Sequence, residues 1–85
     1  FISEMVLKVR IAEQADPDFI EIEIPKSRLS YSSLLKIGCE ELEIDEARVN
    51  RIRKLPDTRL RKDKDVKRLH NFQELEFVVD QKLSS

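Results

Sequence analysis

The sequence has few of the residue types from which small catalytic and metal sites are usually built. Its 85 residues include one glycine, one cysteine, one histidine and no tryptophan. The single glycine, Gly38, cannot form a phosphate-binding loop, because such loops need several glycines at fixed spacing. A structural zinc site needs about four ligands, and Cys39 and His70 do not supply them. We therefore expect no metal and no cofactor.

The chain also lacks any long hydrophobic segment. No apolar run is longer than three residues, as in Met5-Val6-Leu7, so neither a transmembrane helix nor a signal-peptide core is predicted. One cysteine cannot form an internal disulfide, which is typical of a reducing compartment. We expect an intracellular protein, cytoplasmic or nuclear. Because the chain starts at Phe1 and not at methionine, we also expect it to be a domain of a longer protein.

No sequence motif indicates an enzyme. A serine or cysteine nucleophile with His70 as its base is the one catalytic arrangement left open, because such groups meet in space and not in sequence. His70 lies in a polar stretch with no motif around it, which favours a solvated surface histidine. The carboxylates either alternate with apolar residues or crowd one side of a helix, as on exposed surfaces. We expect a protein that is not an enzyme.

Three segments alternate between apolar and polar residues, which predicts half-buried strands at residues 5–12, 19–24 and 74–79. A polar turn over residues 13–18 joins the first two into an antiparallel hairpin, with Lys8 and Arg10 opposite Glu21 and Glu23. The residues expected to point inward are Leu7, Val9, Ile11, Ile20, Ile22, Ile24, Leu75, Phe77 and Val79. Phe19 is expected on the exposed side.

Between these strands the apolar period changes to that of a helix. Apolar residues from Tyr31 to Leu42 form one helical stripe, and Ser30 before them is a good N-cap. Gly38 within this stripe predicts a close approach between helix and sheet. Cys39 lies on the same stripe, so it is read as a core residue first and as a reactive thiol second. Glu40, Glu41 and Glu43 are expected on the outer side.

The second half of the chain is predicted to return to the sheet in short pieces. Asp45 caps a turn, residues 51–55 form a strand, and residues 56–58 form a turn. Residues 59–61 form a short strand with Leu60 inward. A helical turn within residues 63–71 places Val66 and Leu69 in the core.

This order of elements resembles the β-grasp fold of ubiquitin. The resemblance implies an α+β fold, with a mixed four- to five-stranded sheet packed on one α-helix. The domain would span residues 5–80, with tails at 1–4 and 81–85. Conjugated ubiquitin-like proteins end in two glycines, whereas this chain ends at Ser85, so we do not expect a conjugated modifier. The apolar recognition patch of ubiquitin would map near Arg53, Glu76 and Val78, which are mostly charged.

Individual segments carry a closer resemblance. They are Val6 to Ile11, Ile52 to Thr58, Leu60 to Val66 and Phe72 to Glu76. They are similar to the family of C-terminal domains of ankyrin repeat domain-containing protein 40. That resemblance implies a longer parent with N-terminal ankyrin repeats, which are protein-binding modules, but it implies no biochemical activity for this domain.

The near-neutral net charge of −1 hides a strong segregation along the chain. Residues 48–68 contain ten basic and three acidic residues, whereas residues 1–47 contain five basic and eleven acidic residues. Clustered charge of one sign speeds encounter with an oppositely charged partner and selects against others. The residues that we expect to bind a partner are Arg51, Arg53, Lys54, Arg59, Arg61, Lys62 and Lys64.

Several interpretations of this basic segment remain open. It could be a solvated surface balanced by the acidic half, a docking site for an acidic protein segment, or a phosphate-binding surface for nucleic acid or anionic lipid. No aromatic residue lies between Arg48 and Arg68 to stack on bases, and no apolar helix face is there to enter a membrane. We favour docking of an acidic protein partner, with weak head-to-tail self-association as a further alternative.

Overall fold

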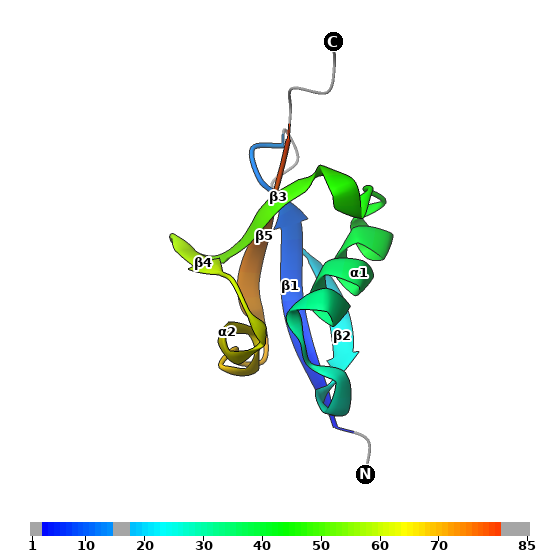
Figure 1. Cartoon of the computed structure of the whole chain (residues 1–85), viewed down its shortest axis with the longest axis vertical. Coiled ribbons are helices and arrows are strands. Elements are labelled where there is room, and N and C mark those ends of the chain that lie inside the picture. The colour runs from blue at the N-terminus through cyan, green and yellow to red at the C-terminus, as the bar shows by residue number, and fades with distance from the viewer. Residues whose placement is uncertain (1–2, 15–17, 81–85) are drawn as a thin grey trace.

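The structure, a computed structural model, describes residues 3–14 and 18–80. Its main elements are a five-stranded sheet and one long helix (Figure 1). The elements are β1 (Glu4–Ile11), β2 (Ile20–Pro25), the 3-10 turn η1 (Lys26–Arg28), α1 (Tyr31–Leu42), the 3-10 turn η2 (Glu46–Arg48), β3 (Val49–Lys54), β4 (Thr58–Leu60), α2 (Asp63–Lys67) and β5 (Gln73–Val79). The predicted α+β class and the predicted order of elements are confirmed.

The sheet is mixed, with the strand order β2-β1-β5-β3-β4. The two strands that lie far apart in sequence, β1 and β5, pair in parallel at its centre, and every other neighbouring pair is antiparallel. A bulge between Val49 and Arg51 shifts the register of β3 against β5. No helix in the described part of the chain is long and apolar enough to cross a membrane.

The predicted hairpin of β1 and β2 forms, with two corrections. Lys8 is directly opposite Glu21 as expected, but Val6 and not Arg10 is opposite Glu23. Arg10 instead pairs with Glu76 of β5, because β5 lies against the other side of β1. Ile20 was expected inside the core and is 37% exposed, since it lies at the end of an edge strand. Of the predicted turn, residues 15–17 lie outside the described residues.

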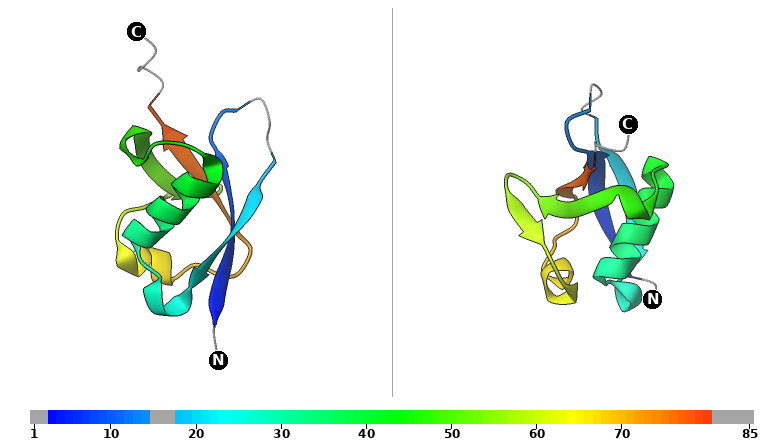
Figure 2. Two further views of the ribbon diagram at one scale, coloured as in Figure 1. Left: turned by 90° about the vertical axis from the view of Figure 1, so that its right-hand side faces the viewer. Right: turned by 45° about the horizontal axis from the view of Figure 1, so that its top comes forward.

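Helix α1 lies across one side of the sheet (Figure 2). It begins where predicted, because the Ser30 hydroxyl accepts a hydrogen bond from the backbone N–H of Ser33 at 3.1 Å. Gly38 packs against the ring of Phe77 on β5, and a Cβ at this position would lie only 2.7 Å from Cε2 of that ring. The close approach predicted from the glycine is therefore confirmed.

The remaining predicted elements are present with small changes of boundary. Strand β3 begins two residues before residue 51, and β4 covers residues 58–60 rather than 59–61. Leu60, Val66 and Leu69 are buried as expected. The predicted domain starts one residue after β1 begins, and residues 1, 2 and 81–85 of the expected tails lie outside the described residues.

Candidate protein-interaction surface

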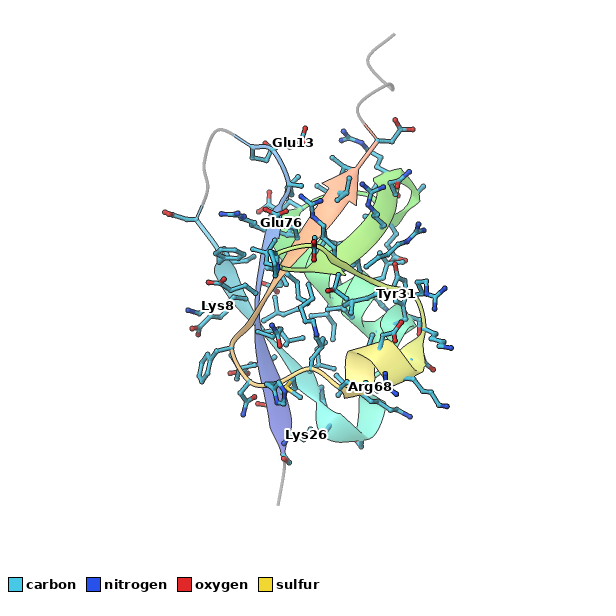
Figure 3. The ribbon with its side chains drawn as sticks, turned by 90° about the vertical axis from the view of Figure 1, so that its left-hand side faces the viewer. Lys8, Glu13, Lys26, Tyr31, Arg68 and Glu76 are labelled. Atoms are coloured by element: carbon cyan, nitrogen blue, oxygen red, sulfur yellow. The ribbon has the colours of Figure 1, made fainter. Side chains whose placement is uncertain are left out.

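Three of the predicted partner-binding residues meet on the side of the sheet opposite α1, which we call the open face and which Figure 3 views. Arg51 and Arg53 flank the buried Ile52 on β3, so their side chains point away from the core. Arg59 of β4 is directly opposite Arg53 and therefore lies on the same face. Two short strands thus place three guanidinium groups side by side.

Three other predicted residues continue this charge beyond the end of β4. Arg61 and Lys62 follow the strand, and Lys64 lies in the first turn of α2. With Tyr31, Ser32 and Asp63 they line one shallow depression between α2 and the start of α1. Lys54 is different, because it alternates with Arg53 and lies half-buried on the side of Ile52.

Arg53 does not present a free charge, because it is held by a carboxylate. Its Nε and Nη2 atoms donate hydrogen bonds to Oε1 of Glu76 at 3.0 and 2.7 Å. Arg10 binds the other oxygen of the same carboxylate, with Nε at 2.9 Å and Nη2 at 2.8 Å. One carboxylate on β5 therefore joins the strands on both sides of it.

The environment of Glu76 explains why a carboxylate can be buried on an otherwise exposed face. Its residue surface is only 6% exposed. Burial alone would raise the pKa of Glu76, but the hydrogen bonds from Arg53 and Arg10 and their positive charges lower that pKa by more. Glu76 is therefore ionised at neutral pH, and its one negative charge offsets one of the two positive charges of Arg10 and Arg53.

The other cations of this region have no such partner. Within the part of the chain that the structure describes, Arg59, Arg61, Lys62 and Lys64 form no ion pair within 4.0 Å, and all four are exposed. Arg51 donates a hydrogen bond to the side-chain oxygen of its neighbour Asn50 at 3.1 Å. Because asparagine is neutral, this bond does not compensate the charge of Arg51. We call these five residues the basic surface.

Two of the three acidic residues within the basic segment, residues 48–68, are engaged by backbone groups. Asp63 accepts a hydrogen bond from the backbone N–H of Tyr31 at 2.9 Å, and Asp65 accepts one from the N–H of Arg61 at 2.9 Å. The bond from Arg61 is the main reason why the pKa of Asp65 is lowered. These carboxylates therefore hold α2 in place, and their lone pairs are partly occupied before any cation side chain reaches them.

An aromatic residue joins the basic surface from outside its segment. Tyr31 lies at the start of α1 and lines the same depression as Arg61, Lys62 and Lys64; Figure 3 shows it on the side of the molecule that carries Arg68. The sequence suggested no aromatic residue here, because Tyr31 lies far from residues 48–68 along the chain. They come together because β4 runs back along β3 and then leads into α2.

Two phenylalanines differ in exposure, and one of them is not where the sequence predicted it. Phe19 was expected to be exposed, but it is half-buried under Arg10, whose guanidinium carbon lies 4.3 Å from the ring centroid. Phe72 is instead the most exposed large apolar residue among those described, at 55%. Its φ of 66° is unusual for a non-glycine residue. The preceding residue, Asn71, is of a type that favours turns.

The remaining candidate chemical groups do not form a site. Cys39 is 2% exposed in the core, as predicted, and His70 is exposed. Among residues 3–14 and 18–80, no three histidine, cysteine, aspartate or glutamate side chains come close enough together to hold a metal ion. The exposed cations of the basic surface are the candidate groups that remain.

Burial should make the Cys39 thiol unreactive. Desolvation, followed by the nearby charges of Glu46 and Asp45, raises the pKa of this thiol from its ordinary value of 9.0 to about 11. At neutral pH the thiolate fraction therefore falls about a hundredfold. We expect a thiol-specific reagent to modify the native domain at least about a hundred times more slowly than the urea-unfolded chain. Equal rates in the two states would show that Cys39 is accessible and reactive.

Known proteins resemble this chain over most of its length. It is 54% identical over 78 residues to ankyrin repeat domain-containing protein 40 of Mus musculus, which covers 89% of this chain and 22% of that protein. The Homo sapiens protein of the same name gives 54% identity over 78 residues, with 89% of this chain and 21% of that protein covered. The chain therefore spans about a fifth of the length of these relatives.

A shorter human relative and a family model agree with this result. The chain is 54% identical over 71 residues to the putative ANKRD40 C-terminal-like protein of Homo sapiens, covering 84% of this chain and 62% of that protein. No solved structure matches the chain. The model of the ANKRD40 ubiquitin-like domain matches residues 9–80, which confirms both the predicted β-grasp fold and the predicted resemblance. The chain belongs to the ANKRD40 ubiquitin-like domain family.

Proposed function

We propose that this chain is a non-catalytic ubiquitin-like domain that binds an acidic protein segment through the basic surface. The observation that carries the proposal is that some cations of this region are bound to a carboxylate and their neighbours are not. Arg10 and Arg53 share the carboxylate of Glu76, which offsets one of their two positive charges, whereas Arg59, Arg61, Lys62 and Lys64 are exposed and form no ion pair among the residues described. Free guanidinium and ammonium groups of this kind attract carboxylates and steer their approach.

The shape of the basic surface favours a protein segment as its partner. Its cations extend from β3 across β4 to the first turn of α2, and the hollow at the end is shallow and lined on one side by Tyr31. An extended acidic peptide could follow this path, with a short apolar residue near Tyr31. The same charges would also attract nucleic acid or anionic lipid, and these remain the alternatives that an experiment must separate.

Charge reversal on this surface should weaken the binding of an acidic peptide strongly. We expect a labelled peptide of alternating glutamate and apolar residues to bind the domain at low salt. Its affinity should fall as the salt concentration rises. A variant with Arg59→Glu, Arg61→Glu and Lys62→Glu replaces three attractions by repulsions, which should cost about 2 kcal/mol, or about 30-fold in affinity. Fluorescence anisotropy over a salt series measures both effects.

A matched variant tests whether position or total charge matters. Lys26→Glu, Arg28→Glu and Lys36→Glu reverse the same number of exposed charges on η1 and α1, and we expect this variant to bind the peptide nearly as well as the wild type. Equal losses in both variants would contradict a defined docking surface. Tighter binding of a DNA duplex or of phosphatidylserine vesicles than of the peptide would contradict a protein partner.

A further inference from the structure

The two edges of the sheet run in opposite directions, so they can pair with each other in neighbouring molecules. Strand β2 is antiparallel to β1, and β1 is parallel to β5. Strand β3 is antiparallel to β5, and β4 is antiparallel to β3, so β4 runs parallel to β1 and antiparallel to β2. A second copy placed beside β4 in the same orientation would thus offer its β2 as an antiparallel neighbour.

At the β2 edge the free backbone groups belong to glutamates. The N–H of Lys26 donates to the carbonyl of Ser3 on the β1 side at 2.9 Å. Because the direction of these groups alternates along an antiparallel strand, those of Ile20, Ile22 and Ile24 also face β1. The groups of Glu21 and Glu23 therefore face outward, and their side chains alternate with the buried Ile22 onto the open face.

At the β4 edge the free backbone groups belong to an arginine. The N–H of Leu55 donates to the carbonyl of Glu74 on β5 at 3.2 Å, so alternation directs the groups of Arg53 toward β5 and those of Ile52 and Lys54 toward β4. Ile52 is opposite Leu60 and Lys54 is opposite Thr58. The remaining residue of β4, Arg59, therefore directs its N–H and C=O away from the sheet.

We propose that the domain associates head to tail with a second copy, with β4 of one molecule pairing antiparallel with β2 of the next. This inference rests on the proposed function, because the acidic partner is here the β2 edge of another copy. We place Arg59 opposite Glu23. In this register Leu60 lies opposite Ile22, and Arg61 lies opposite Glu21. Both faces of the joined sheet then match, with opposite charges on the open face and apolar residues on the α1 side.

The charges at this contact are available for it. Glu21 and Glu23 are exposed and form no ion pair within 4.0 Å to any residue that the structure describes. The backbone N–H of Arg61 is already bound to Asp65, so the contact offers backbone hydrogen bonds mainly at Arg59. A pairing of so few residues is weak. Because each copy uses a different edge toward each neighbour, the contact repeats without closing.

A charge swap between the two edges tests this contact. We expect the wild type to form oligomers beyond a dimer as its concentration rises in sedimentation experiments at low salt, and to dissociate at high salt. Glu21→Lys with Glu23→Lys, or Arg59→Glu with Arg61→Glu, should each weaken association about tenfold or more. All four substitutions in one chain should restore it, as should mixing the two double variants.

Control measurements separate this proposal from its alternatives. Glu40→Lys with Glu46→Lys changes the net charge by the same amount at exposed positions away from both edges, and should leave association intact. A monomeric wild type at all concentrations, or no recovery in the swapped chain, would overturn the proposal. The Glu21→Lys, Glu23→Lys variant keeps its basic surface, so its binding of the acidic peptide reports on the proposed function independently of self-association.

Discussion

Replacing Gly38 by alanine is expected to destabilise the domain, although alanine is the better helix former. The added Cβ would overlap the end of the Phe77 ring, which is itself completely buried in the core. Overpacking of this kind costs about 3 kcal/mol, whereas the gain in helix propensity is about 1 kcal/mol. We expect the free energy of unfolding in urea to fall by about 2 kcal/mol, with a melting temperature lower by about 10 °C.

A second substitution shows whether the Phe77 ring is the cause. Phe77→Leu removes the ring atoms that the new Cβ would meet, at a cost of about 1 kcal/mol or slightly more on its own. In this background Gly38→Ala should become neutral or stabilising, so the two substitutions should show a coupling energy of about 2 kcal/mol in a double-mutant cycle. A Gly38→Ala protein that is more stable than the wild type would refute the tight contact and leave helix propensity as the dominant effect.

The core of this fold could be predicted from the sequence because each repeating pattern of apolar residues lies within one short segment of the chain. The alternation in β1, β2 and β5 and the helical stripe of α1 each specify which residues face inward, and the single glycine marks where helix and sheet meet. The exceptions lie at the margins of the sheet. Ile20 continues the pattern of β2 but stays partly exposed, because no second strand flanks it there.

Which charged side chains form ion pairs could not be predicted in the same way, because it depends on the order of the strands in the sheet. Arg10, Arg53 and Glu76 are far apart in sequence, and alternation predicts only that each points outward. They meet because β5 inserts between β1 and β3, which places one carboxylate between two guanidinium groups. The net charge of the segment therefore overestimates the free charge of β3, whereas the exposed cations of β4 and α2 retain theirs.

Replacing Glu76 by glutamine should destabilise the domain strongly at neutral pH. The variant would keep a polar group of the same size, but would lose the charge that holds Arg10 and Arg53 on each side of β5. Loss of hydrogen bonds between charged groups, with two guanidinium groups left facing each other, should cost about 2–3 kcal/mol. Urea unfolding at neutral pH measures this loss, and the exposed Glu74→Gln on the same strand and face should cost less than about 0.5 kcal/mol.

The dependence on pH identifies the charge of Glu76 as the cause. The pKa of Glu76 in the folded protein is lowered from its ordinary value of 4.5 by its two arginines, against the effect of burial. A lowered folded-state pKa gives stability that is complete above the unfolded value and disappears as the pH falls through the folded value. The stability gap between the wild type and Glu76→Gln should therefore be constant above about pH 5.5 and close only in more acidic solution. A gap of the same size at all pH values would mean that glutamine disturbs packing, and that the ion pairs add nothing to stability.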